Sequence, residues 1–230
     1  MHAWILGVAA AATALLASAA HADDDASAAR PCPRSTGAVL ERFISAECEA
    51  CWTDPSVARP DAGDWLLDWI VPSARGEAAP LSSAAPVEAR GRVERAMKAA
   101  LADDRASVQR TPARGASSLQ LSVLSGPAWN GYFGVRIDGG GRAPAGSAAW
   151  VALVESVASG TDGTAAPREL VRTVSGPLTP PELRQGKPWQ HLLAMRWPET
   201  AKASRLRARA WIEDARGHIV AMAGERCGAR

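Results

Sequence analysis

Histidine is scarce in this chain, and its charged residues form no block of one sign. The sequence of 230 residues contains 4 histidines, of which His191 and His218 lie beyond position 22. No Ser/His/Asp arrangement or paired-carboxylate spacing stands out, so hydrolytic chemistry has little support. The 26 basic residues are interspersed with 24 acidic ones and form no basic cluster of the kind that nucleic-acid binding uses. We therefore predict no nucleic-acid partner.

Long apolar runs are equally scarce. A single stretch near the start approaches the length of a membrane span. Residues 3–20 carry no charged side chain and end in the small-x-small pattern Ala-His-Ala at positions 20–22, ahead of three aspartates. This layout predicts a secretory signal peptide over residues 1–22 rather than a transmembrane anchor. We expect a periplasmic or secreted mature protein that begins at Asp23 and has no membrane span after cleavage.

The mature chain divides into regions of different periodicity. Residues 23–36 are rich in Asp, Ala and Pro and are predicted to be a loose lead-in. Residues 37–105 mix strand and helix signals. Residues 117–227 alternate short apolar strands with Gly- and Pro-containing turns, which is typical of an antiparallel β-sandwich. The predicted fold class is α+β, with a small α/β domain before the sandwich.

The individual elements follow from apolar runs and from helical spacing. In the first region, strands are predicted at 38–44 and 65–71, and a helix at 93–101. In the second region, strands are predicted at 119–123, 133–137, 148–154, 190–197, 206–212 and 218–223. The tight turn at 214–217 predicts a hairpin between the last two strands.

One motif carries recognisable chemistry, the Cys-x-x-Cys of Cys48 and Cys51, directly after the first predicted strand. A thiolate is the nucleophile of disulfide exchange, and a second cysteine two residues further on can close an intramolecular disulfide after the attack. A helix start at Cys48 would stabilise its thiolate, whereas the charges of Glu47 and Glu49 would oppose it. A structural disulfide in a small loop is the competing interpretation, and the sequence leaves both open.

The other cysteines of the mature chain are Cys32 and Cys227, which flank the predicted folded region. An even number of cysteines in an exported protein suggests disulfides. Once Cys48 and Cys51 pair with each other, Cys32 and Cys227 remain, and we predict a structural disulfide between them. A zinc site would need both pairs as ligands. We predict neither a metal site nor a cofactor.

Residues 39–51, Val-Leu-Glu-Arg-Phe-Ile-Ser-Ala-Glu-Cys-Glu-Ala-Cys, resemble the opening of a family of exported bacterial thioredoxin-like proteins of unknown function. Segments 151–155, 168–172 and 210–214 are similar to the C-terminal part of that family in order and spacing. The resemblance implies a reduced thioredoxin-like domain at 37–105, followed by a β-sandwich. It also implies a cis-proline facing the cysteines, for which Pro86 is the candidate.

Two functions are compatible with these patterns. The first is a weak thiol–disulfide oxidoreductase or isomerase that acts on the thiols of exported proteins, with Cys48 attacking and Cys51 resolving. The second is a non-enzymatic periplasmic binding or assembly protein whose disulfides are structural and whose protein partner is unidentified. The sequence does not decide between them, and it determines neither the redox potential nor the oligomeric state.

Overall fold

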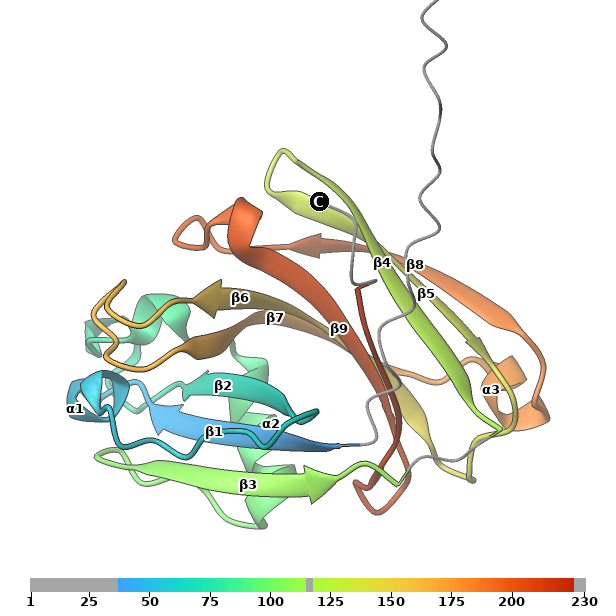
Figure 1. The fold of residues 1–230 in the computed structure, drawn as a ribbon, viewed down its shortest axis with the longest axis horizontal. Coiled ribbons are helices and arrows are strands. Elements are labelled where there is room, and N and C mark those ends of the chain that lie inside the picture. Colours follow the sequence, from blue (N-terminus) through green and yellow to red (C-terminus); the bar gives the residue numbers. More distant parts are fainter. Residues whose placement is uncertain (1–36, 115–117, 226–230) are drawn as a thin grey trace, which may run out of the picture.

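The computed structural model describes residues 37–114 and 118–225, which form two β-sheets with a few short helices (Figure 1). The strands are β1 (Ala38–Ser45), β2 (Trp65–Val71), β3 (Ala106–Pro112), β4 (Gln120–Trp129), β5 (Tyr132–Gly140), β6 (Ala148–Val157), β7 (Arg168–Leu178), β8 (Trp189–Arg196), β9 (Leu206–Glu213) and β10 (Ile219–Gly224). The α-helices are α1 (Glu49–Thr53), α2 (Glu88–Met97) and α3 (Pro181–Gln185), and the 3-10 turns are η1 (Gly76–Ala78), η2 (Ser82–Ala84) and η3 (Ala203–Arg205).

The larger sheet has seven strands in the order β10-β9-β6-β7-β2-β1-β3, and the smaller has three in the order β4-β5-β8. Within the larger sheet, β2 runs parallel to both β1 and β7, and the other neighbouring pairs are antiparallel. The larger sheet thus combines β1 and β2 from the first predicted region, β3 from the stretch between the two predicted regions, and four strands from the second. Its strands do not divide at the predicted boundary between residues 105 and 117.

The predicted fold class, a thioredoxin-like α/β unit followed by a separate β-sandwich, is therefore wrong. The described chain is mainly β, and its longest helix, α2, has 10 residues. The expected separation into two domains fails because β2 pairs with β1 on one side and with β7 on the other, where Asp68 lies opposite Leu170. A strand from the second region thus completes the sheet that the first region begins.

Strand β1 is the second strand from one edge of the larger sheet, between β2 and β3, and it is buried along its whole length. Because side chains alternate between the two faces of a strand, Glu41 and Arg42 point to opposite sides of the sheet. Glu41 faces α2, where it accepts hydrogen bonds from Arg92 (2.7 Å) and from the indole of Trp69 (3.0 Å). Arg92 also pairs with Glu213 of β9, which ties α2 to both halves of the sheet.

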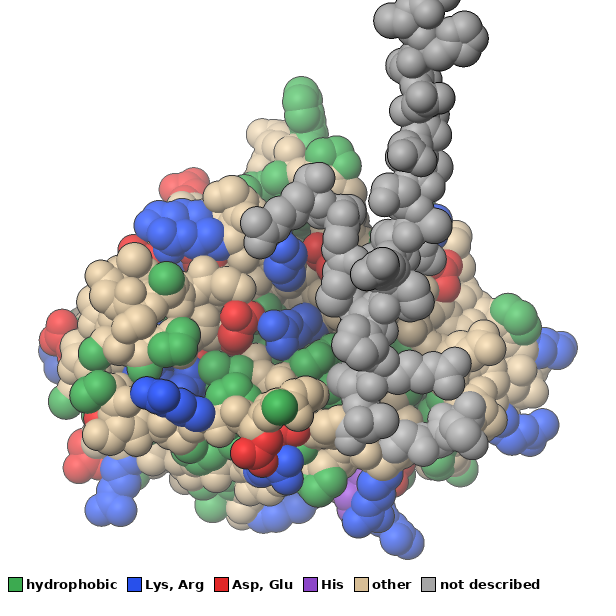
Figure 2. All heavy atoms as spheres, viewed as in Figure 1, with side chains coloured by type: hydrophobic (Ala, Val, Ile, Leu, Met, Phe, Trp, Pro, Cys, Tyr) green, Lys and Arg blue, Asp and Glu red, His purple; other side chains and the backbone are tan. Residues whose placement is uncertain are grey.

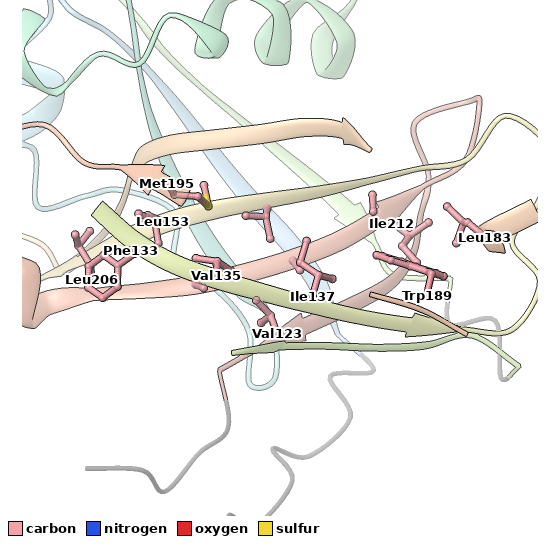
Figure 3. Packing of buried hydrophobic residues seen from close by; sticks show 14 of the residues in the cluster. Val123, Phe133, Val135, Ile137, Leu153, Leu183, Trp189, Met195, Leu206 and Ile212 are labelled. Atoms are coloured by element: carbon pink, nitrogen blue, oxygen red, sulfur yellow. The ribbon is translucent and has the colours of Figure 1, made fainter. Parts of the chain in front are cut away.

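The largest apolar core lies between the small sheet and the β6 and β9 strands of the large sheet (Figure 3). Val135 and Ile137 of β5 point into it and meet Leu153 and Ile212 from the opposite sheet. These residues are fully buried, whereas their neighbours along β5 are exposed or half-buried. The alternation fixes which face of the small sheet remains in solvent.

Most of the predicted strands are confirmed, with shifted ends. The run at 65–71 coincides with β2, and a hairpin joins β9 to β10 as predicted. The predicted helix at 93–101 is instead α2, which ends at Met97 because Lys98 adopts a left-handed conformation (φ 59°). Strands β3 and β7 were not predicted.

The described residues contain no helix long and apolar enough to cross a membrane. The predicted signal peptide, lead-in and Cys32 lie in residues 1–36, and Cys227 lies in residues 226–230, all outside the described residues. The signal peptide and the Cys32–Cys227 disulfide therefore stay predictions.

Candidate functional site

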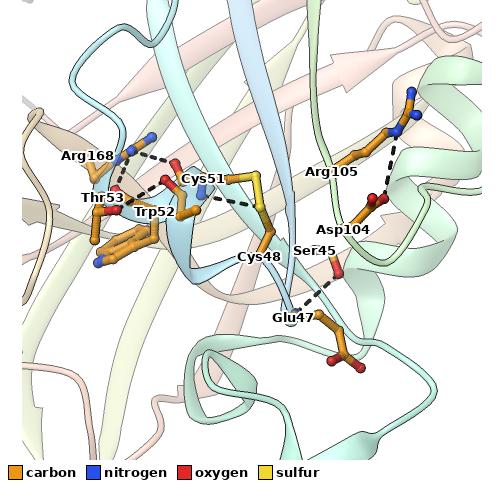
Figure 4. The surroundings of a disulfide bond; sticks show 10 residues. Ser45, Glu47, Cys48, Cys51, Trp52, Thr53, Asp104, Arg105 and Arg168 are labelled. Carbon is orange, nitrogen blue, oxygen red and sulfur yellow. Dashed lines mark hydrogen bonds and ion pairs between the residues drawn. A yellow bond between two sulfur atoms is a disulfide. The ribbon is translucent and has the colours of Figure 1, made fainter.

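Cys48 and Cys51 form a disulfide at the carboxyl end of β1, with their Cα atoms 5.2 Å apart (Figure 4). The chain leaves β1 at Ser45, turns, and enters the five-residue helix α1 with Cys48 as its N-cap residue. The amide of Cys51 donates a hydrogen bond of 3.3 Å to the Cys48 sulfur. The motif therefore lies between a strand and a helix, as its sequence context predicts, although the surrounding fold is not that of thioredoxin.

The exposure of the two sulfur-bearing residues differs in the direction opposite to the predicted roles. Cys48, the predicted attacking residue, is only 9% exposed, whereas Cys51, the predicted resolving residue, is half-buried and packs against the apolar cluster around Ile44, Trp52 and Ile70. A thiol must be reached by its substrate before it can react. The burial of Cys48 therefore weighs against its attack on a folded protein substrate.

Glu47, whose charge was expected to disfavour a thiolate at Cys48, binds Ser73 and Arg75 through its carboxylate. Ser73 donates a hydrogen bond of 2.7 Å to its carboxylate, and Arg75 donates another of 3.1 Å. The hydrogen bond from Ser73 lowers the pKa of Glu47 from its ordinary value; desolvation opposes this, and Arg75 lowers it further. Glu47 thus anchors the loop that follows β2.

Arg168, the first residue of β7, holds the other end of α1. Its guanidinium donates hydrogen bonds to the carbonyls of Cys51 (3.1 Å) and Trp52 (2.6 Å), and it lies over the Trp52 ring at 5.1 Å. The Trp52 indole in turn donates a hydrogen bond of 2.9 Å to the carbonyl of Asp162. Carbonyls at the end of a helix lack intrahelical partners, so a cation there is stabilising. These contacts fix α1 and the disulfide from both sides.

Asp68 of β2 is the shared carboxylate partner of two buried arginines in this region. Its carboxylate accepts hydrogen bonds from Arg42 at 2.6 and 2.7 Å and lies 3.5 Å from Arg168. All three side chains are almost inaccessible to solvent. Burial lowers the pKa of Arg168, and the Asp68 carboxylate partly offsets that effect. Removing one partner from such a cluster leaves a buried charge unpaired, which costs about 3–5 kcal/mol.

The prediction for Pro86 is not supported. Within residues 37–114 and 118–225 the cis peptide bond is Gly176–Pro177, so the bond before Pro86 does not have the cis geometry that the resemblance implies. Pro86 instead lines a cavity together with Arg172 and Arg196.

A second candidate site lies on the solvent face of the small sheet. The β4–β5 hairpin turns through Asn130 and Gly131, and it places Trp129 directly opposite Tyr132. Trp129 is 81% exposed and Tyr132 44% exposed. Hydrophobic side chains protrude at the top of Figure 2, over the tip of this hairpin.

The register places further side chains on the same solvent face. Phe133 points into the core, so Tyr132 beside it points outward, and alternate residues of β5 follow it on that side. Residues opposite one another in an antiparallel pair share a face, which adds residues of β8. We call this set the outer face: Trp129, Tyr132, Arg136, Leu192 and Arg196.

Gly134 lies on β5 between the aromatic tip and Arg136, and it leaves the outer face without a side chain at that position. Leu192, further along the face, is 70% exposed. A side-chain carbon built at Gly134 would meet no atom within 4 Å, so another chain could approach the backbone there. Arg136 pairs with Asp138 at 3.0 Å, whereas Arg196 forms no ion pair within the described residues. The outer face therefore presents apolar area beside one uncompensated positive charge.

Sequence reasoning identified the cysteines but not the residues that hold them or the outer face. Glu41, Arg42 and Asp68 interrupt apolar strand runs, which is a signal for buried ion pairs. Asn130-Gly131 is a strong hairpin signal, and its aromatic neighbours could have been marked as the flanks of a tight turn. No group of three metal-ligating side chains occurs among the described residues.

Comparison with protein-family models, curated proteins and solved structures found no match to this chain. Its function is therefore inferred from its own residues and their geometry.

Proposed function

We propose that this protein is an exported, non-enzymatic binding or assembly protein that binds another exported protein through its outer face. The observation that carries the proposal is the exposed hairpin tip, where Trp129 is 81% and Tyr132 is 44% accessible. Tryptophan, tyrosine and arginine are the residues most enriched at the energetic centres of protein interfaces. An apolar patch of this kind on a folded domain is typical of an interaction site.

The charge of the outer face favours a different protein over a second copy of this chain. A two-fold dimer through this face would bring the same patch from each copy together, including the uncompensated Arg196. A partner with a carboxylate near its apolar contact residues would complement that charge instead. We expect the partner surface to be apolar at its centre and acidic at its edge.

In this proposal the Cys48–Cys51 disulfide is structural. Cys48 is buried, α1 is held by Arg168, and the sequence at positions 1–22 is typical of an export signal. Disulfides persist in oxidising compartments, which agrees with an exported protein. The disulfide would close a small loop and keep Trp52 in its buried place.

A weak oxidoreductase is the second candidate. Its support is the position of the cysteines between β1 and α1, together with a cavity of about 350 Å³ beside Ala46 that Pro72 and Val87 also line. Alkylation of the reduced protein across pH separates the two. A Cys48 thiol that titrates at about 8.5 or above, together with no insulin reduction, would exclude the enzyme.

The binding proposal is tested by photo-cross-linking in the cell that exports the protein. A photoreactive residue at Leu192 should give one discrete adduct with another exported protein, and W129A should abolish it. The control position is Val108, which is 46% exposed on β3 and lies in the other sheet. No adduct from position 192, equal adducts from both positions, or an adduct with a second copy of this chain would contradict the proposal.

A further inference from the structure

The strongest unassigned feature is a cavity of about 340 Å³ between the two sheets. One wall is β7, a second is the end of β8 with the residues that follow it, and a third is the segment from Ser83 to Pro86. Thr200 links two of these walls, because its hydroxyl donates a hydrogen bond of 3.2 Å to the Ser83 carbonyl. The cavity therefore has walls from segments far apart in the sequence.

Its polar side is built around Arg172, a residue that is 7% exposed. The Nη2 atom donates a hydrogen bond of 3.2 Å to the Thr200 hydroxyl, and Nε lies 2.9 Å from a carboxylate oxygen of Glu155. Nη1 has no hydrogen bond within the described residues. Because Arg172 lines the cavity, Nη1 is available to donate a hydrogen bond to a ligand there.

Arg196 supplies a second guanidinium, from the wall that the end of β8 forms. It is exposed and forms no ion pair within residues 37–114 and 118–225. No acidic residue lines the cavity, and Thr173 and Ser83 add hydroxyl groups to the lining. Trp197 and Pro86 provide apolar surface beside these polar groups.

The charge count favours a ligand with a single negative charge. Glu155 neutralises Arg172, so the pair contributes no net charge, and Arg196 contributes one positive charge. A carboxylate matches this excess, and guanidinium groups bind carboxylates through short charge-assisted hydrogen bonds. The doubly charged form of phosphate would be undercompensated. The apolar lining fits a small aliphatic group that carries the carboxylate.

We propose that this cavity binds a carboxylate on a small apolar group, with Arg172 Nη1 and the Arg196 guanidinium as its donors. The cavity shares Arg196 with the outer face, whereas Arg172 and the other lining residues lie outside that face. The proposal does not require that the outer face binds a partner. Two sources offer this chemistry, the C-terminus of a peptide and a free small organic acid, and the experiment distinguishes them.

The test is calorimetric titration of the whole protein with four probes. These are N-acetyl-Ala-Ala-Val with a free carboxylate, the same peptide as its C-terminal amide, 3-methylbutyrate, and inorganic phosphate. We expect the free-carboxylate peptide to bind and the amide not to bind. Tighter binding of the peptide identifies a chain terminus as the ligand, and tighter binding of 3-methylbutyrate identifies a small acid. Equal binding of peptide and amide would overturn the proposal.

Variants assign the effect to the named side chains. R196Q changes an exposed residue and should weaken carboxylate binding roughly tenfold, which corresponds to one charge-assisted contact. R216Q removes an arginine from the β9–β10 turn, outside the cavity, and should change nothing. An unchanged affinity in R196Q would refute the site.

A gain of affinity gives a second, independent readout. E155Q removes the carboxylate that neutralises Arg172, so the charge of the site rises by one. We expect roughly tenfold tighter binding of the carboxylate probe and measurable binding of phosphate. Weaker carboxylate binding in a folded E155Q protein would contradict the assignment of Arg172. W129A should leave all four titrations unchanged, so this proposal and the proposed function can fail separately.

Discussion

The surroundings of the disulfide and the outer face of the small sheet differ in how much of their interacting surface has a partner inside the protein. Around Cys48 and Cys51, the helix carbonyls and the Trp52 indole accept or donate hydrogen bonds, and the three buried charges form ion pairs, although Nη1 of Arg168 makes no hydrogen bond within the described residues. On the outer face, Trp129 and Leu192 have most of their surface in water. The motif with recognisable chemistry is thus fixed within the structure, whereas the proposed partner surface carries no sequence motif.

This difference teaches that Cys-x-x-Cys spacing alone does not identify a redox centre. A reactive pair needs an accessible sulfur and a neighbourhood that tolerates a change in bonding. Here Cys48 is 9% exposed, and Arg168 connects α1 to the charges of Arg42 and Asp68. The same spacing is equally suited to hold a short helix in place.

The largest expected effect is that of Asp68→Ala. The substitution leaves Arg42 and Arg168 buried without their carboxylate, and we expect a loss of about 3–5 kcal/mol in the free energy of unfolding. Urea denaturation measures it. Asp104→Ala is the control, because the Asp104 side chain is 85% exposed and should matter by less than about 0.5 kcal/mol. A loss in D68A as small as in the control would show that the disulfide region is not anchored as described.

The comparison can be sharpened with one tryptophan from each region. Trp52→Ala removes a ring that is 7% exposed and should cost about 3–5 kcal/mol in stability. Trp129→Ala removes a ring that is 81% exposed and should change stability by less than about 0.5 kcal/mol. Thermal and urea unfolding of both variants provide the measurement. Similar losses in the two variants would mean that Trp129 is part of the core rather than of a binding surface.

The smallest expected effect concerns Glu47 and pH. Ser73, whose hydrogen bond is the main cause, lowers the pKa of Glu47 in the folded protein. Its ionised form therefore stabilises the fold above the ordinary carboxyl pKa, and this contribution is lost as pH falls through the lowered value. Ser73→Ala should consequently be less stable than the wild type near pH 7, and the difference should shrink towards about pH 3. A difference that is independent of pH would exclude this role of Glu47.

The sequence predicts elements where apolar runs have clear ends and misses them where they do not. Strand β2 is bounded by Asp64 and Pro72, and it was predicted at its observed residues. Strand β3 has no apolar face and is exposed or half-buried throughout, so periodicity gave no signal for it. The failure at the level of the fold has one source: β2 pairs with β7, about a hundred residues later in the chain, and no local pattern encodes that choice.

The site shows the same limit. The cysteines could be found from their spacing, whereas the partners of Asp68 depend on the register between β1 and β2 and on where β7 begins. The exposure of Trp129 depends on which face of the small sheet covers the core, which is decided by the packing of Val135 and Ile137 against β6 and β9. Both the partners of Asp68 and the exposure of Trp129 depend on contacts between segments far apart in the sequence, so neighbouring residues do not predict them.

The most direct test of the central claim compares two variants in the photo-cross-linking experiment at Leu192. Cys48→Ala with Cys51→Ala should cost about 2 kcal/mol, the loop-closure contribution of so short a disulfide, yet leave the adduct within about twofold of the wild type. Trp129→Ala should keep its stability and reduce the adduct at least roughly tenfold. Circular dichroism confirms that each variant is folded under the conditions used. Loss of the adduct in the folded cysteine variant, with retention in W129A, would contradict the account and return the function to the disulfide.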